Sequence, residues 1–174
     1  QIGVSPEVVM NHETYEKGLF AEYIDLAIRN RDEIRGIIQQ ISGRDLPSDW
    51  FPYNPIGSDG SMDGVSVTGY EKPYVLWRDS SGNEGKSDIR KAHGKMPWRI
   101  DWAARWVIHG ITCEPAGKDH GSAGGSYDTG IPICKLLGGN PPDKIVYEWI
   151  QLRGMGPMSS SSGLTIGPME ALSL

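Results

Sequence analysis

Apolar residues in the first part of the chain recur at the three- and four-residue spacing of a helix. Between residues 12 and 42 they form two stripes. Tyr15, Leu19, Tyr23, Leu26 and Ala27 form the first stripe, and Ile34, Ile37, Ile38 and Ile41 form the second. Charged residues fill the other faces, as is typical of a solvated surface. Asn30 lies between the stripes, so the pattern predicts one bent helix or two helices, ended by a C-cap at Ser42 and Gly43.

Helical periodicity disappears between residues 45 and 95, where Pro, Gly, Ser and Asp indicate turns. Two short runs, residues 65–68 and 73–77, have the β-branched and aromatic content of strands. We therefore expect a small, irregular β insertion. It contains no Cys, and His93 is its only His, so we expect no zinc in this chain.

From residue 96 onward the pattern alternates between strand and helix. In chain order it predicts an amphipathic helix over 102–109, a buried strand of the parallel type over 111–114, a Gly-rich loop over 117–125, a helix over 126–137 and a second strand over 144–152. Strand, loop, helix, strand and loop make half of a doubly wound nucleotide-binding fold. The predicted class is α/β, with a helical part at 1–44, the β insertion at 45–95 and the nucleotide-binding half at 96–174.

Composition narrows the class of protein. A chain of 174 residues can bury one sizeable core, and its net charge of −5 gives no general footprint for nucleic acid. We see no signal peptide and no membrane span, and we interpret Cys113 and Cys134 as core thiols of a cytoplasmic protein, with a disulfide or a catalytic thiol as alternatives. The chain starts without Met and stops where a helix begins at Pro168, so we expect a fragment.

Two loops favour a nucleotide site. Ser159, Ser160, Ser161 and Ser162 lie between glycines directly after the second strand, where backbone N–H groups and hydroxyls can hold phosphates. The alternative is a flexible surface loop. In the other loop, Asp119 can accept hydrogen bonds from a ribose, and His120 can contact a carboxylate or an amine. Gly124 and Gly125 there allow a base or phosphate close to the backbone. The alternative is an ordinary turn with a structural histidine.

Aromatic residues flank these loops. Trp98, Trp102 and Trp106 are spaced by four and share a helix face, which favours a core patch. Trp98 comes first, so it could instead lie outside the helix and wall a pocket, and a neighbouring Arg can stack on a Trp. Tyr147 and Glu148 alternate along the second strand, so we expect only one of them in a given pocket, with a buried core Tyr as the alternative.

Together these segments resemble the class I lysyl-tRNA synthetases of the archaeal type. The resemblance is carried by Lys95-Met-Pro-Trp-Arg-Ile-Asp-Trp-Ala-Ala-Arg-Trp106, Glu114-Pro-Ala-Gly-Lys-Asp-His120, Gly124-Gly-Ser-Tyr-Asp-Thr-Gly130, Pro141-Pro142, Tyr147-Glu148 and Met158-Ser-Ser-Ser-Ser-Gly163, in family order. It is dense over 95–164 and looser before. The last segment is similar to the phosphate-binding K-M-S-K-S loop of class I synthetases.

The resemblance implies the C-terminal half of a Rossmann-type catalytic domain, with the helical segment and the β insertion, in a lysine–tRNA ligase. Its substrates would be lysine, ATP with Mg²⁺ and tRNA-Lys. By the same resemblance, Ser159, Ser160 and Ser161 are catalytic, Asp119, Gly124, Gly125 and Met158 contact ATP, and Trp98, His120 and Tyr147 line the lysine pocket. No residue is expected to hold a metal.

Three departures from the family pattern matter. Pro157 and Ser162 stand where the usual loop has lysines, the insertion lacks the zinc-binding cysteines of some relatives, and the N-terminal ATP loop and the anticodon-binding domain are missing. We therefore expect the chain alone to be inactive. Two alternatives remain: a non-catalytic binding module derived from a synthetase, and a related nucleotidylyl-transfer enzyme for another amino acid.

Overall fold

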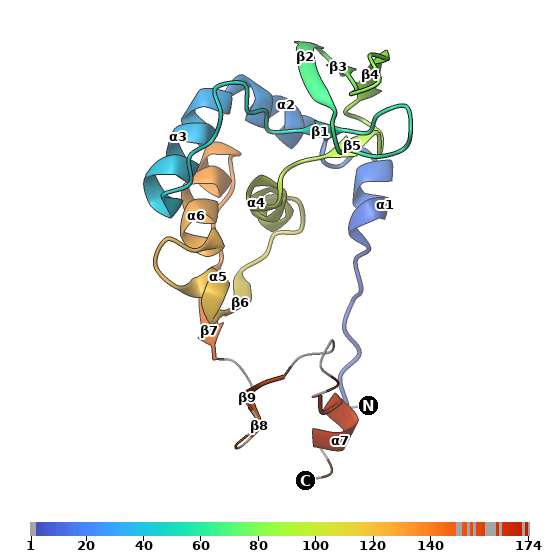
Figure 1. The fold of residues 1–174 in the computed structure, drawn as a ribbon. Helices are drawn as coiled ribbons and strands as arrows, with labels where there is room; N and C mark the ends of the chain where they lie inside the picture. Colours follow the sequence, from blue (N-terminus) through green and yellow to red (C-terminus); the bar gives the residue numbers. More distant parts are fainter. Residues whose placement is uncertain are drawn as a thin grey trace.

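The computed structural model describes residues 3–148, 151, 152, 154, 156–158, 163, 165–171 and 173. Within these residues the chain is mixed α/β, and its helices and its four small sheets are shown in Figure 1. Helix α4 (Trp98–Ile108) lies in the middle, between a layer of helices and the strands of the insertion. No helix in the described part of the chain is both long enough and apolar enough to cross a membrane.

The N-terminal segment forms three helices, α1 (Asn11–Glu16), α2 (Ala21–Arg29) and α3 (Arg31–Ser42). The break at Asn30 and the C-cap at Gly43, whose φ is 66°, are confirmed. The predicted stripe through Leu19 is wrong, because the chain turns at Gly18, with a φ of 72°, before α2 begins. This turn changes the helical register, so Leu19 is exposed, and Phe20 and Ile24 are buried in its place.

The β insertion is built on an antiparallel sheet of β2 (Ser66–Glu71), β3 (Tyr74–Arg78) and β4 (Glu84–Asp88). A second pair joins β1 (Asn54–Pro55) to β5 (Gly94–Lys95). The two predicted strands correspond to β2 and β3. Strand β4 was missed because its sequence, Glu-Gly-Lys-Ser-Asp, has no β-branched or aromatic residue. Its pairing with all of β3 places it in the sheet.

Asp25 joins the insertion to the helices. Its buried carboxylate accepts hydrogen bonds from the Tyr70 hydroxyl and the Lys72 ammonium, both at 2.8 Å, and from Arg29. Burial disfavours the charged form, but the hydrogen bonds from Lys72 and Tyr70 outweigh it and lower the pKa of Asp25. The ionised carboxylate therefore stabilises the contact between α2 and the insertion.

The last part of the chain contains β6 (Cys113–Gly117), α5 (Lys118–Gly121), α6 (Ser126–Leu136) and β7 (Asp143–Tyr147). Strands β6 and β7 are parallel, as predicted, and α5 and α6 form the crossover between them. They make a sheet of two strands. Three short elements follow among the described residues: β8 (Gln151–Leu152), β9 (Gly156–Pro157) and α7 (Pro168–Ala171).

Three predictions about this part were wrong in detail. Helix α4 begins at Trp98 rather than at residue 102, because Pro97 at the N-cap position directs the chain into the helix. Strand β6 is only partly buried and Cys113 is exposed, so of the two cysteines only Cys134 is a core thiol. Strand β7 ends at Tyr147 and is exposed along its whole length, since β6 and the single turn of α5 cover it only in part.

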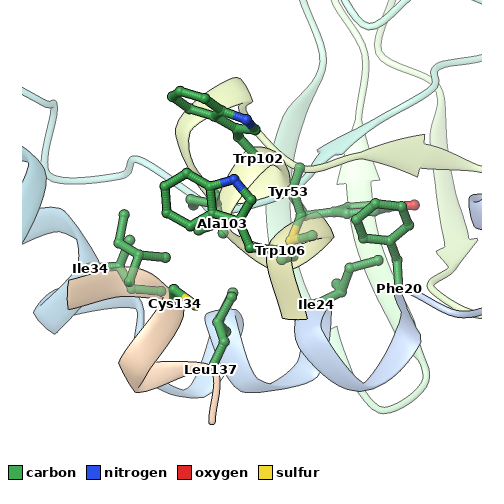
Figure 2. Close-up of a cluster of buried hydrophobic side chains, with 14 of the residues drawn as sticks. Phe20, Ile24, Ile34, Tyr53, Trp102, Ala103, Trp106, Cys134 and Leu137 are labelled. Atoms are coloured by element: carbon green, nitrogen blue, oxygen red, sulfur yellow. The ribbon is translucent and has the colours of Figure 1, made fainter. Parts of the chain in front are cut away.

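One hydrophobic core joins residues from all three predicted parts of the chain. Figure 2 shows Trp106 of α4 between Ile34 of α3, Cys134 and Leu137 at the end of α6, and Tyr53 of the insertion. Gly130 permits the close approach of α6 to α4, because a Cβ there would lie 2.6 Å from the Trp106 ring. The Trp106 indole Nε1 donates to Glu114 at 2.8 Å, so the core also holds the start of β6.

Candidate functional site

A cavity in the described structure lies at the carboxyl ends of the two parallel strands, where open α/β sheets commonly bind ligands. We call it the strand-end cavity. Its volume is about 420 Å³. It is lined by Gly117, Lys118, Asp119, His120, Tyr147, Glu148 and Met158. Gly117 and Tyr147 are register partners in the last pair of the β6–β7 ladder, so the sheet itself brings the two segments together.

Two glycines shape the wall of this cavity. A Cβ at Gly117 would lie 2.8 Å from the Asp119 carboxylate, so glycine lets that side chain fold back over the strand end. A Cβ at Gly121 would lie 2.7 Å from Val146, so glycine there lets the single turn of α5 lie against β7. The sequence Gly-Lys-Asp-His-Gly thus presents Lys118, Asp119 and His120 at the sheet edge.

The polar side chains around the cavity contact one another. Lys118 and Glu148, both exposed, form an ion pair at 2.8 Å. Asp119 Oδ2 lies 3.5 Å from Nε2 of His120, and Nδ1 of His120 lies 3.2 Å from the Ser126 hydroxyl. These contacts favour the tautomer in which Nε2 carries the proton and Nδ1 accepts from Ser126. The imidazole is therefore held between α5 and the start of α6.

A second cavity of about 250 Å³ lies on the other side of His120. We call it the tryptophan cavity. Its lining residues are Ile38, Arg44, Leu46, Trp50, Pro97, Trp98, Arg99, His120 and Ser126. His120 lines both cavities, and its ring centroid lies 5.9 Å from that of Trp98. The predicted residues Trp98, His120, Asp119, Tyr147 and Met158 are thus brought into one neighbourhood.

Trp98 belongs to the helix, which corrects the alternative that placed it outside. It is the first residue of α4, is 51% exposed and stacks on Trp102 with ring centroids 5.4 Å apart. The Arg105 guanidinium lies over the Trp98 ring, 5.3 Å from the ring centroid, as expected for a cation–π pair. Trp102 and Trp106 are buried, so the shared helix face is core at one end and cavity wall at the other.

Tyr147 and Glu148 behave differently from the prediction. Both line the strand-end cavity, although strand alternation was expected to separate them. The reason is that β7 ends at Tyr147, so Glu148 no longer follows the strand geometry. Tyr147 is 54% exposed, which overturns the alternative of a buried core tyrosine.

Gly124 and Gly125 are not among the described residues that line either cavity. The Gly124 amide donates to Asp128 and the Gly125 amide donates to the Ser122 carbonyl. The Gly125 carbonyl accepts from Arg99 at 3.1 Å. A Cβ at residue 125 would lie 2.3 Å from the His120 carbonyl, so packing alone requires glycine there. Ser159, Ser160, Ser161 and Ser162 lie outside the described residues.

Several residues of this neighbourhood were not predicted. Lys118 and Glu148 pair with each other in the lining of the strand-end cavity. Arg99 joins α4 to α6 by donating to the Gly125 carbonyl and, at 2.8 Å, to the Thr129 hydroxyl. Burial, with a smaller effect of nearby Arg44, lowers the pKa of Arg99. Lys118, Glu148 and Arg99 each stand next to a predicted site residue in the sequence, and this adjacency was the only sequence signal for them. Within the described residues, no group of three or more His, Cys, Asp or Glu side chains could hold a metal ion.

Comparison with known proteins gives a consistent result. The sequence model of a family described as tRNA synthetases class I (K) matches residues 1–174. A "Lysine--tRNA ligase" of Thermoplasma acidophilum is 41% identical over 174 residues, covering 99% of this chain and 34% of that protein. One of Archaeoglobus fulgidus is 39% identical over 171 residues, covering 97% and 34%. "Lysine--tRNA ligase 1" of Methanosarcina acetivorans is 42% identical over 176 residues, covering 99% and 33%. The chain therefore spans about a third of the length of these relatives.

Proposed function

Because the chain belongs to the class I (K) family of tRNA synthetases, we propose that it forms part of the catalytic domain of a lysine–tRNA ligase. The observation that carries the proposal is the meeting of Asp119, His120, Tyr147 and Met158 at the carboxyl ends of two parallel strands, with Trp98 beside them. These residues come from segments up to sixty positions apart, and five of the predicted contact residues converge on one place.

Lysine recognition rests on Trp98, His120 and Tyr147. The two aromatic rings are each about half exposed beside the cavities, which suits a cationic side chain lying against them. Glu148 offers carboxylate oxygens for an ammonium group. His120 lies between the two cavities, where its proton on Nε2 can donate to a carboxylate oxygen of the amino acid.

ATP is proposed to bind in the strand-end cavity, with the ribose on Asp119 and Met158 at the wall. The Lys118 ammonium supplies a positive charge for a phosphate if it leaves its exposed pair with Glu148. Mg²⁺ would arrive with the triphosphate, since it usually binds through substrate phosphates and keeps several waters. The serines 159–161 remain predicted phosphate ligands. A contact of adenosine with Gly124 and Gly125 must leave the hydrogen bonds of their amides and of the Gly125 carbonyl to protein in place.

The reaction would begin when the lysine carboxylate attacks the α-phosphorus of ATP. The bond to the β-phosphate oxygen breaks, pyrophosphate leaves, and lysyl-adenylate forms. A hydroxyl of the terminal ribose of tRNA-Lys then attacks the lysyl carbonyl and releases AMP. Neither step needs a covalent bond to the protein. The residues of the site would therefore act by positioning the substrates and by stabilising the charge of the transition state.

A Rossmann-type domain is the finer fold that we propose. Strands of parallel sheets are normally covered on both faces, yet Ile145, Val146 and Tyr147 of β7 are 45–58% exposed. The crossover through α5 and α6 supplies one βαβ unit of such a domain. With about two thirds of the relatives' length outside the match, further strands and helices would cover β7 in a complete enzyme.

The test is lysine-dependent exchange of pyrophosphate into ATP by a complete enzyme that includes this chain, assayed with all twenty amino acids. Lysine should support the fastest exchange, and another amino acid in that position would contradict the proposal. His120→Gln should raise the KM for lysine about tenfold or more, through loss of a charged hydrogen bond. His12→Gln, at an exposed position of α1, a helix that contributes no lining residue to either cavity, is the matched control. The 174-residue chain alone should show no exchange.

One observation favours a second candidate, a non-catalytic binding module. Pro157 and Ser162 stand where the related loop carries two lysines, so charges that could hold pyrophosphate are missing. Restoring both with Pro157→Lys and Ser162→Lys distinguishes the candidates in the complete enzyme. A rise in exchange rate supports catalysis, whereas no exchange before or after restoration supports the binding module.

A further inference from the structure

The tryptophan cavity has two arginines, Arg44 and Arg99, in its lining. Arg44 follows the C-cap of α3 directly, and Arg99 lies in the first turn of α4. Helices α3 and α6 lie side by side in Figure 1, and a Cβ at Gly124 would be 3.1 Å from the Ile41 carbonyl oxygen. The end of α3 therefore reaches the loop that leads into α6. The cavity forms where this end meets the beginnings of α4 and α6.

Arg99 is fixed by one of its nitrogens and leaves two others unused. Its Nη1 donates to the Gly125 carbonyl at 3.1 Å and to the Thr129 hydroxyl at 2.8 Å. Thr129 is fully buried, so this anchor belongs to the core. Nε and Nη2 of Arg99 donate to no described residue, and neither is among the buried polar atoms without a partner. The guanidinium thus has a fixed position and two accessible donors for a ligand.

Arg44 brings a second guanidinium to the same place. Its side chain is exposed and makes no hydrogen bond or ion pair with a described residue. The segment that carries it is held to α3, because Nε and Nη2 of Arg35 donate to the Leu46 carbonyl at 3.3 and 3.0 Å. The charge of Arg44 acts on Arg99 and contributes, after burial, to the lowered pKa of Arg99. Two neighbouring positive charges repel each other, and an anion between them would remove that repulsion.

No carboxylate of the described lining balances these charges. None of the described residues around the tryptophan cavity is Asp or Glu. Asp45 accepts from the Gln39 amide at 3.2 Å. Asp128, in the first turn of α6, pairs with Lys144 at 3.3 Å. The cavity is therefore positively charged in a chain whose net charge is −5.

The remaining lining suits a nucleotide base. Trp50 is partly buried against the core and has no aromatic or cationic partner over its ring among the described residues. Ile38 and Leu46 add apolar surface beside it. Aromatic rings next to positive charges are the usual means by which proteins hold single-stranded nucleic acid. The volume of about 250 Å³ lies below the roughly 300–1,000 Å³ of sites that enclose a whole small ligand, so it suits one nucleotide of a longer chain.

We propose that the tryptophan cavity binds the 3′-terminal nucleotide of an RNA, with its phosphate on Arg44 and Arg99 and its base beside Trp50. A guanidinium can hold two phosphate oxygens at once, which favours a phosphodiester. The inference rests on the proposed ligase function, whose second step needs a terminal ribose next to the lysyl carbonyl. His120 lines both cavities, so lysyl-adenylate in the strand-end cavity and a ribose in the tryptophan cavity would meet beside it.

The first experiment measures binding of a labelled single-stranded RNA that ends in CCA to a complete enzyme that includes this chain. By fluorescence anisotropy, Arg44→Gln should weaken binding about fivefold, the scale of one exposed charge pair. It should also reduce the slope of log affinity against log salt concentration by about 0.7, the value for one phosphate of a single strand.

Lys135→Gln is the matched control, since it removes the same charge from an exposed position near the other end of α6 and lines neither cavity. It should change neither the affinity nor the slope. An equal loss in both variants would reduce the effect to general surface charge and overturn the proposal. Binding of AMP that depends on Arg44, without binding of the RNA, would show a free-nucleotide site and overturn it too.

The second experiment measures aminoacylation by the same enzymes. Arg44→Gln should raise the KM for tRNA about fivefold and leave the KM values for lysine and ATP unchanged. Absence of lysine-dependent activity in the wild type contradicts the proposed function, whereas RNA binding is still measured independently. A wild type that charges tRNA, with an Arg44→Gln variant unchanged in both KM for tRNA and RNA affinity, overturns this inference alone.

Discussion

The helical body and the strand-end region are built in opposite ways. In the body, Trp106, Ile34, Ile133 and Cys134 are at most 1% exposed, and the Trp106 indole N–H is paired with Glu114. At the strand end, Ile145, Val146 and Tyr147 are 45–58% exposed, and the ion pair of Lys118 with Glu148 is open to solvent. The two regions adjoin through α6, whose first residue Ser126 contacts His120 and whose later residues enter the core.

This difference indicates that the two regions contribute differently to stability and to ligand binding. Burial of the core side chains stabilises the fold, whereas the exposed groups at the strand end contribute little to stability and are available to ligands. The four predictions that follow test this separation. The first three change a residue of the buried region and compare it with a matched position, and the last changes a residue of the strand end.

The largest effect is expected for Trp106→Ala. Removing a fully buried Trp leaves a large cavity between α4, α6 and α3, and it also leaves Glu114 without its donor, so the free energy of unfolding should fall by about 3–5 kcal/mol. Urea denaturation followed by circular dichroism measures it. Trp98→Ala, on the same helix face but half exposed, is the control. Equal losses at the two positions would contradict the proposed division.

A change of one methyl group should have an intermediate effect. Gly130→Ala places a Cβ 2.6 Å from Trp106 and should destabilise the chain by about 1–3 kcal/mol through overpacking. Gly36→Ala is the matched control, since nothing lies within 4 Å of a Cβ there and the position is in helix α3. It should raise stability by about 0.5–1 kcal/mol. Thermal unfolding should therefore show a lower melting temperature for Gly130→Ala and a higher one for Gly36→Ala than for the wild type.

Asp25 tests a charge inside the buried region. Its pKa is lowered in the folded chain, so its contribution is fully present above its ordinary value of 3.8 and is lost as pH falls below that value. Urea unfolding between pH 6 and about 3 should therefore show a smaller loss of stability for Asp25→Asn than for the wild type. Asp49→Asn, at an exposed position, should leave the pH profile unchanged. Parallel profiles for Asp25→Asn and wild type would refute this role.

The smallest effect on stability is expected at the strand end. Tyr147→Ala should change the free energy of unfolding by less than about 0.5 kcal/mol, because the side chain is 54% exposed. The same substitution should raise the KM for lysine in a complete enzyme. A loss of stability comparable with that of Trp106→Ala would show that Tyr147 is a structural residue.

Local patterns predicted the helices well where one face meets the core and where a cap marks the end. The C-cap at Gly43, the break at Asn30 and helix α6 followed from spacing and from the Gly and Asn residues at the ends of these helices. Leu19 failed because one left-handed glycine, Gly18, changed the register, and β4 failed because pairing with β3 decides its conformation. Both errors concern interactions between residues that the periodicity of a single segment does not contain.

The sequence by itself determined the family, the order of strands and helices around the crossover, and the residue types available for a site. The motifs indicate the family and the order of elements directly, because the spacing of residues within one segment depends on local backbone geometry. Only the tertiary structure decided that Tyr147 and Glu148 share a cavity, that His120 lines two cavities, and that Gly125 is required by packing against His120. Contacts of this kind, between residues far apart in the sequence, depend on where each strand ends and on which elements pack together. Both are properties of the whole folded chain.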